Sequence, residues 1–264
     1  MSGDANGASA NTEYQQLAGK TALVTGGGRG IGRAIVDLFL DHGASVVSCG
    51  RGERPSDLDD KVLWIRCDVA DAASVESLKV EIQKKHGALS VLVNNAGIQI
   101  EKTLTDSTDA DWDLLMGVNA RGVFNCCRAF IPDMKPASSI INIGSISGRV
   151  ADPEMALYNA SKAFVHGLTR SVAVDHGAAV RCNAILPGWI MTEMADSAFE
   201  LAEDPALAKR DALARHPVGR FGAPTDIANM ALWLASDASA FANGQCFTVD
   251  GGMTSASPLN PGLF

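Results

Sequence analysis

Short apolar runs alternate with longer amphipathic runs along most of the chain. Residues 21–24, 44–49, 62–67 and 89–93 are apolar over the length of a buried strand, whereas residues 31–40 show the spacing of an amphipathic helix. No linker-like stretch interrupts this alternation between Thr21 and Val249. Strands that alternate with helices favour a parallel sheet covered by helices on both faces. The pattern therefore predicts an α/β fold built on a doubly wound sheet.

The length of the chain is compatible with one domain. It has 264 residues, and α/β folds of roughly 200–250 residues often form a single domain. We expect residues 17–264 to form that domain and residues 1–16, which are small and polar, to form a mobile head without a catalytic role. The head lacks the basic start and apolar core of a signal peptide. No apolar run approaches the ~20 residues that span a bilayer, so we expect no membrane partner.

Charge and composition argue against several other classes. A net charge of −8 disfavours nucleic acid as a partner, because nonspecific affinity for it comes largely from neutralised phosphates. The six cysteines show no C-x-x-C spacing and the five histidines are scattered, so we expect no metal site. Cysteines without a secretory signal indicate reduced thiols, and we expect a cytoplasmic protein.

A glycine-rich turn follows the first apolar run. It has the pattern G-x-x-x-G-x-G at Gly26, Gly30 and Gly32, with Arg29 inside it, and the amphipathic run begins at Ile31. The order strand, glycine turn, helix presents backbone N–H groups and the positive end of a helix to a pyrophosphate. A glycine cluster alone is equally typical of an ordinary tight turn.

Tyr158 and Lys162 stand four residues apart, so a helix would place them on one face. A neighbouring ammonium would lower the pKa of a phenol from about 10 toward the range useful for proton transfer. Alone, this spacing also fits an ordinary amphipathic edge. Ser145, however, lies thirteen residues before Tyr158, in a Ser/Gly-rich turn after a buried strand.

With the glycine turn, Ser145, Tyr158 and Lys162 in this order, the chain resembles the classical short-chain dehydrogenase/reductase family from about residue 19 to residue 252. The segments 94–97 (Asn-Asn-Ala-Gly), 112–119 ending in Asn119, 187–188 (Pro-Gly) and 249–252 are similar to further landmarks of that family. The resemblance implies a Rossmann-like fold with about seven parallel strands. It also implies reversible, NAD(P)-dependent hydride transfer between nicotinamide and a ketone or secondary alcohol.

The resemblance assigns roles to four catalytic residues. Tyr158 would be the general acid or base, and Lys162 would lower its pKa and hold the ribose of the nicotinamide half. Ser145 would donate a hydrogen bond to the substrate oxygen, and Asn119 would place a water beside Lys162. The cofactor-binding residues that it implies are Gly26, Gly28, Arg29, Gly30, Ile31, Gly32, Gly50, Arg51, Asp68, Val69, Asn95, Ala96, Gly97, Tyr158, Lys162, Pro187, Gly188, Ile190 and Thr192.

The end of the second strand bears on the choice of coenzyme. Relatives that prefer NAD carry an acidic residue there, which binds the adenosine ribose; this chain has Gly50 followed by Arg51. A guanidinium can bind a 2′-phosphate through paired charge-assisted hydrogen bonds, and Arg29 resembles the second basic position of NADP-preferring relatives. NADP(H) is therefore favoured and NAD(H) remains possible. The loop 52–61, with Pro55, is too short for the helix that many relatives have here.

Residues 191–217 are helical in composition and are expected to form a mobile lid over the site, although an ordinary pair of surface helices also fits. An apolar substrate pocket is expected from the side chains Ile98, Ile100, Val150, Pro153, Met155 and Trp189. Asp152 and Glu154 would either add polar contacts to that pocket or face solvent.

Two other functions were weighed. A serine hydrolase would need G-x-S-x-G, but Ile146 takes the central place between Gly144 and Gly148. A non-catalytic nucleotide-binding sensor or scaffold of the same fold stays open as the alternative, although such relatives usually lose the tyrosine or the lysine. By resemblance we expect a homotetramer, or a dimer. The tail after Gly252 would reach a neighbouring subunit or active site.

Overall fold

A computed structural model describes residues 15–200 and 202–256. The greater part of the expected head, and the end of the tail, lie outside these described residues. Within them, seven parallel strands form one sheet in the order β3-β2-β1-β4-β5-β6-β7. The strands are β1 Thr21–Thr25, β2 Ser45–Gly50, β3 Leu63–Arg66, β4 Val91–Asn94, β5 Ser138–Ile143, β6 Val180–Pro187 and β7 Cys246–Val249. The predicted doubly wound sheet of about seven parallel strands is confirmed.

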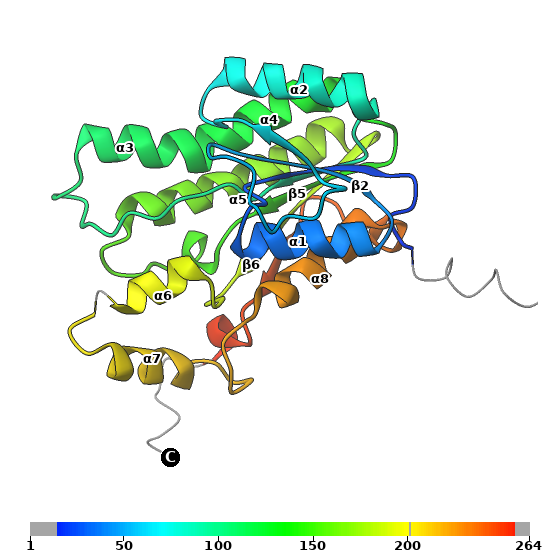
Figure 1. Cartoon of the computed structure of the whole chain (residues 1–264). Helices are drawn as coiled ribbons and strands as arrows, with labels where there is room; N and C mark the ends of the chain where they lie inside the picture. The colour runs from blue at the N-terminus through cyan, green and yellow to red at the C-terminus, as the bar shows by residue number, and fades with distance from the viewer. Residues whose placement is uncertain (1–14, 201, 257–264) are drawn as a thin grey trace, which may run out of the picture.

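Helices cover both faces of this sheet (Figure 1). Helices α1 (Gly30–Asp41) and α8 (Pro224–Ala235) pack on one face. Helices α2 (Ala72–His86), α4 (Gly122–Phe130) and α5 (Ala156–His176) pack on the other. Helix α3 (Asp109–Met116) leads through a short turn into α4 and contacts α5, whereas α6 (Glu193–Glu200) and α7 (Pro205–Ala214) lie outside these layers (Figure 1). No helix of the described residues is both long enough and apolar enough to cross a bilayer.

Burial on both faces explains why the central strands read as uninterrupted apolar runs. In β4, Val91 and Val93 belong to the core cluster under α1 and α8, whereas Leu92 belongs to the cluster under α2, α4 and α5. All three side chains are fully buried. Successive residues of a strand point to opposite faces, so a strand covered on both sides has no polar face.

The strand order fixes where a ligand can bind. The chain runs outward from β1 to β2 and β3, and then returns to place β4 on the other side of β1. Such a switch point leaves a crevice at the carboxyl ends of the strands, where α/β proteins bind their ligands. The turn after β1, the segment after β4 and the turn after β5 all open at this edge of the sheet.

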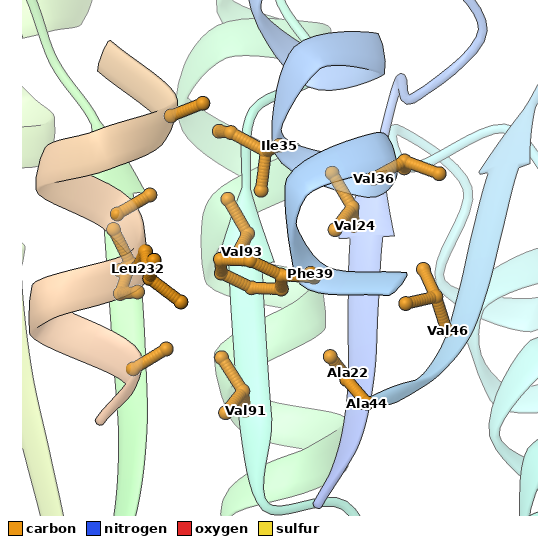
Figure 2. Close-up of a cluster of buried hydrophobic side chains, with 14 of the residues drawn as sticks. Ala22, Val24, Ile35, Val36, Phe39, Ala44, Val46, Val91, Val93 and Leu232 are labelled. Atoms are coloured by element: carbon orange, nitrogen blue, oxygen red, sulfur yellow. The ribbon is translucent and has the colours of Figure 1, made fainter. Parts of the chain in front are cut away.

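A substitution of Phe39 on α1 would test how the layer of α1 and α8 packs on the sheet. Its ring is fully buried and lies between α1 and the sheet, beside Val93 and Leu232 (Figure 2). We expect Phe39→Ala to lower the free energy of unfolding by about 3–5 kcal/mol, because removing a buried ring loses its transfer free energy and leaves a cavity. Urea denaturation would measure the loss. Val80→Ala, on a residue of α2 that is 55% exposed, is the control and should change stability little; equal effects would contradict the packing described.

Candidate active site

The glycine turn after β1 depends on the absence of side chains. Gly26 and Gly30 have φ values of 69° and 55°, in the left-handed region that favours glycine. A Cβ on Gly32 would lie only 2.4 Å from the carbonyl oxygen of Gly26. No side chain caps the first turn of α1, so its N–H groups stay available to an anion.

Hydrogen bonds tie the segment after β4 to this turn. Thr25 Oγ1 accepts from the backbone N–H groups of Asn95 and Ala96, at 3.0 Å each. In return, Asn95 Nδ2 donates to the carbonyl oxygens of Thr25 at 2.9 Å and Gly26 at 3.1 Å. The two predicted cofactor-binding segments therefore form one rigid wall of the crevice.

Gly97 lies close to two other predicted site residues, Asn119 and Lys162. A Cβ placed on it would lie 3.4 Å from Asn119 Oδ1 and 3.7 Å from Lys162 Nζ. A side chain at position 97 would therefore occupy the space in front of the Lys162 amine. The absence of a side chain at Gly97 leaves room next to the Lys162 amine, where the flat nicotinamide–ribose half of a dinucleotide would fit.

Asn119 lies in a π turn, Gly117–Arg121, between α3 and α4; such turns are frequent at functional sites. Its amide is committed to other residues. Oδ1 accepts from the Ile98 N–H at 2.8 Å, and Nδ2 donates to the Ile98 carbonyl at 2.9 Å and to Ser161 Oγ at 3.1 Å. Asn119 thus links the segment after β4 to α5, a role that the sequence did not reveal.

Tyr158 and Lys162 lie one turn apart on α5, as their spacing predicts. Lys162 Nζ is 5.5 Å from the centroid of the Tyr158 ring and donates to the carbonyl oxygen of Ile143, at the end of β5, at 3.0 Å. The lysine is buried, and burial lowers the pKa of its amine to about 8. The carbonyl of β5 therefore fixes the amine at the crevice.

Lys162 is predicted to lower the pKa of Tyr158, and for the chain by itself this prediction is wrong. Burial raises the pKa of the phenol to about 12; the hydrogen bond with Ser145 opposes this rise, and the negative charge of Asp152 adds to it. The sequence reveals the neighbouring Lys162 amine, which would lower the pKa of the phenol. The loss of water around the phenol depends on the folded chain. Desolvation disfavours the charged phenolate, and it is the largest cause of the raised pKa of Tyr158.

Ser145 stands where β5 ends and begins a short 3₁₀ turn, Ile146–Gly148. Its Oγ accepts from the Ser147 N–H at 3.1 Å and donates to Ser147 Oγ at 3.1 Å. Ser147 Oγ in turn donates to a carboxylate oxygen of Asp152 at 2.9 Å. Sequence analysis did not predict Ser147, because a serine in a Ser/Gly-rich turn has no distinguishing spacing.

The side of the crevice where the adenosine is expected carries an unpaired guanidinium. Arg51 is exposed, and its side chain makes no hydrogen bond or ion pair with the described residues. Gly50 before it is covered by Trp64, since a Cβ on Gly50 would lie 2.9 Å from the indole. The same indole comes within 3.3 Å of a Cβ built on Gly28. The Trp64 side chain thus forms one wall of this site. From the sequence it is recognisable only as a residue of the third strand.

The loop after Arg51 contains no helix, as expected from its length. It is fastened to α1 instead: Arg33 binds the carboxylate of Asp57 at 3.0 Å and its carbonyl oxygen at 2.6 Å. Leu58 is buried in the core. The loop is therefore anchored at two points beside the adenosine site.

Arg29 is expected to be the second residue that binds the phosphate, but in the structure it is paired with a carboxylate. Its Nη1 lies 2.7 Å from Glu193 Oε2, the first residue of α6, and the two side chains are 78% and 71% exposed. The ion pair joins the glycine turn to the predicted lid segment. The pairing was not predictable from sequence, because 164 positions separate the two residues.

The remaining predicted cofactor residues lie around the same ends of strands. Thr192 approaches the turn, since a Cβ on Gly30 would meet its side chain at 3.4 Å. Val69, after β3, packs against Gly122, and Asp68 Oδ1 accepts from the Ala70 N–H at 3.0 Å. Those not yet placed are Ile31 at the start of α1 and Pro187, Gly188 and Ile190 at and after the end of β6.

A separate cavity lies away from the catalytic residues. It measures about 330 Å³ and includes Ile190, but none of the four catalytic residues lines it. Of the three charged residues in its wall, Arg220 and Asp226 bind each other at 2.7 and 2.9 Å, and Asp250 accepts hydrogen bonds from Thr254. Among residues 15–200 and 202–256, no group of three or more His, Cys, Asp or Glu residues is arranged to hold a metal ion.

Comparison with known proteins identifies the architecture. A family model described as enoyl-(acyl carrier protein) reductase matches residues 26–254. An NADP-dependent (R)-specific alcohol dehydrogenase of Lentilactobacillus kefiri is 40% identical, over 90% of this chain and 98% of that protein. The 3-oxoacyl-[acyl-carrier-protein] reductase FabG of Thermotoga maritima is 36% identical, over 90% and 99%.

A solved structure agrees with these relatives. The ligand-free aldohexose dehydrogenase of Thermoplasma acidophilum superimposes with a TM-score of 0.87 at 33% identity, covering 93% of this chain and 98% of that one. Matches of this extent cover the whole catalytic region, including the glycine turn, Asn119, Ser145, Tyr158 and Lys162. The chain therefore belongs to the short-chain dehydrogenase/reductase family of NAD(P)-dependent oxidoreductases.

Proposed function

We propose that this chain reduces a neutral ketone with NADPH, or oxidises the corresponding secondary alcohol with NADP⁺, and that Tyr158 moves the proton. The observation that carries the proposal is the convergence of Ser145, Tyr158 and Lys162 at the carboxyl edge of the sheet, beside the uncovered backbone of Gly97. A non-catalytic sensor would not need this arrangement, and the relatives found are named as enzymes.

The chain's own residues suit a dinucleotide. The glycine turn and the first N–H groups of α1 would hold the pyrophosphate, and the segment Asn95–Ala96–Gly97 would pass along the nicotinamide half. Lys162 would hold the ribose hydroxyls, and Ile190 and Thr192 the carboxamide. When bound, the nicotinamide supplies or accepts the hydride. Asp68 and Val69 would flank the adenine.

Proton transfer falls to Tyr158. In reduction the substrate oxygen gains negative charge, so a donor aimed at it stabilises the transition state. A phenol whose pKa is near 12 is fully protonated at neutral pH, which suits an acid. In oxidation the phenolate is needed, and a positively charged nicotinamide nearby would lower the phenol pKa. Asn119 Oδ1 accepts one hydrogen bond from Ile98 and has a second lone pair, with which it would hold a water that relays the proton past Lys162.

NADP is proposed as the preferred coenzyme because the unpaired guanidinium of Arg51 lies beside Gly50, where no carboxylate could repel a 2′-phosphate. The printed name of the Lentilactobacillus relative supports this preference. NAD(H) remains a possible coenzyme. Arg29 would contribute only on releasing Glu193.

The proposal extends to the lid, the oligomeric state, the N-terminal head and the location of the protein. Helices α6 and α7, which together span most of 191–217, would act as the lid. A homotetramer or dimer would cover apolar side chains that are exposed in the single chain, among them Trp112, Phe124 and Phe164. One domain from residue 17 onward, a mobile head without catalytic function and a cytoplasmic location complete the proposal.

Tyr158→Phe tests the mechanism. We expect kcat for a panel of ketones with NADPH to fall by about 10²–10⁴-fold, the usual contribution of a positioned acid, while NADPH affinity measured by calorimetry stays nearly unchanged. Tyr14→Phe, which alters the only other tyrosine of the chain, is the matched control and should keep full activity. A Tyr158→Phe enzyme with wild-type kcat would refute the role of the phenol.

Arg51→Ala tests the coenzyme preference. We expect KM for NADPH to rise by about 10–100-fold, the worth of a hydrogen-bonded charged contact, and KM for NADH to change little. Lys61→Ala removes another exposed cation from the same loop and should leave the ratio of the two KM values unchanged. If Arg51→Ala raised both KM values equally, Arg51 would not recognise the 2′-phosphate.

A titration tests the Tyr158 pKa directly. In Tyr14→Phe protein every phenolate signal in the ultraviolet difference spectrum comes from Tyr158. We expect Tyr158 to stay protonated at pH values near 10, where a free phenol is half ionised, because its pKa is about 12. Bound NADP⁺ should shift ionisation to lower pH. Half-ionisation near pH 10 in the folded, cofactor-free protein would contradict the effect of burial; urea-unfolded protein gives the reference.

A further inference from the structure

A hydrogen-bond chain with a fixed direction leads from the active-site serine to a carboxylate. Ser147 Oγ lies 2.9 Å from Asp152 Oδ2 and 3.1 Å from Ser145 Oγ. An ionised carboxylate can only accept, and a hydroxyl has one proton to donate. Ser147 must therefore donate to Asp152 and accept from Ser145. The Ser147 N–H also donates to Ser145 Oγ, so the chain holds the Ser145 hydroxyl in one orientation.

Asp152 is itself held against the helix that carries Tyr158. Its main-chain oxygen accepts from Asn159 Nδ2 at 3.1 Å, and Asn159 is the neighbour of Tyr158. The charge of the carboxylate reaches the phenol, because it raises the Tyr158 pKa. A negative charge that acts on the phenol must also act on whatever binds to the phenol.

No cation of the described residues neutralises Asp152. The nearby basic groups are engaged elsewhere: Lys162 Nζ donates to Ile143, and Arg149 binds Thr248 and the Cys246 carbonyl. Lys102, whose backbone pairs with Met155, binds Asp111 at 2.7 Å.

The two other titratable groups beside this turn add no positive charge. His166 packs behind the turn, against Gly144 and Gly148. Burial lowers the pKa of its imidazole to about 4, so it is neutral at pH 7. Glu154 is exposed and negative. Asp152 therefore brings a negative charge to the wall beside Ser145 and Tyr158 without an ion pair among the described residues, since Arg149 and Lys162 hydrogen-bond to neutral groups instead.

We propose that Asp152 is a specificity-determining residue of the substrate site, which selects against ketones that carry a carboxylate close to the carbonyl. The proposal rests on the proposed function, since it assumes that the substrate carbonyl lies between Ser145 and Tyr158. A carboxylate on the substrate would come within several ångströms of Asp152, where like charges repel strongly enough to change affinity about tenfold or more.

A matched substrate pair tests the selectivity. Ethyl acetoacetate and acetoacetate share a ketone but differ in charge, and kcat/KM for each would be measured with NADPH. We expect the wild-type enzyme to prefer the ester. Asp152→Asn should raise kcat/KM for acetoacetate relative to the ester by about tenfold, mainly through KM. Glu154→Gln, the control for a nearby exposed carboxylate, should leave the ratio unchanged. Equal effects of Asp152→Asn on both substrates would overturn the proposal.

Ser147→Ala separates the hydrogen-bond chain from the charge of Asp152. It should leave the preference between the two substrates nearly intact, because Asp152 keeps its charge and its main-chain contact with Asn159. Loss of the preference in Ser147→Ala would overturn the assignment of the selectivity to the Asp152 charge. Circular dichroism of each variant establishes that the fold is retained.

A second measurement needs no turnover. In Tyr14→Phe protein, Asp152→Asn should shift ionisation of the Tyr158 phenol to lower pH, whereas Glu154→Gln should not. If no ketone of a broad panel is reduced, the proposed function fails, and this titration still decides whether Asp152 acts on the phenol. An unchanged titration would overturn the electrostatic part of the inference whatever the activity.

Discussion

Burial of the sheet on both faces is the constraint on which the active site depends. Strands β1, β4 and β5 have almost no exposed surface along their length, so polar chemistry can reach solvent only where each strand ends. The residues there bind one another: Thr25 holds the segment after β4, and the end of β5 holds Lys162. The site is therefore a direct consequence of how the strands terminate, and its precision comes from the rigidity of the sheet.

Desolvation and attraction oppose each other at Tyr158 and Lys162. Burial raises the pKa of the phenol and lowers the pKa of the amine, so the protein alone disfavours both charges. Each shift follows from removing water around an ionisable group. The same loss of water therefore acts on both groups and moves their pKa values in opposite directions.

The sequence allowed the fold to be predicted and the candidate catalytic residues to be named, because both leave local signals. Alternating apolar and amphipathic runs indicate the parallel sheet, and the spacing of Tyr158 and Lys162 places them on one helix face. The features that were missed are contacts between distant segments. Trp64 covers Gly50 through the pairing of β3 with β2, and Arg29 meets Glu193 across the crevice. The direction of the Tyr158 pKa was missed for a related reason, since burial is a property of the assembled layers.

Two different forces act on α6, and their magnitudes decide which one positions it. The Arg29–Glu193 pair is exposed on both sides, and exposed ion pairs contribute about 0–1 kcal/mol. Phe199, at the other end of α6, is buried; its ring stacks on Trp189 with a centroid distance of 4.9 Å and lies 5.7 Å from Phe221. Aromatic pairs add about 0.5–1.5 kcal/mol beyond the burial of their area. The aromatic cluster is therefore the stronger anchor of α6. Loss of the Arg29–Glu193 pair would therefore leave the helix with its main attachment.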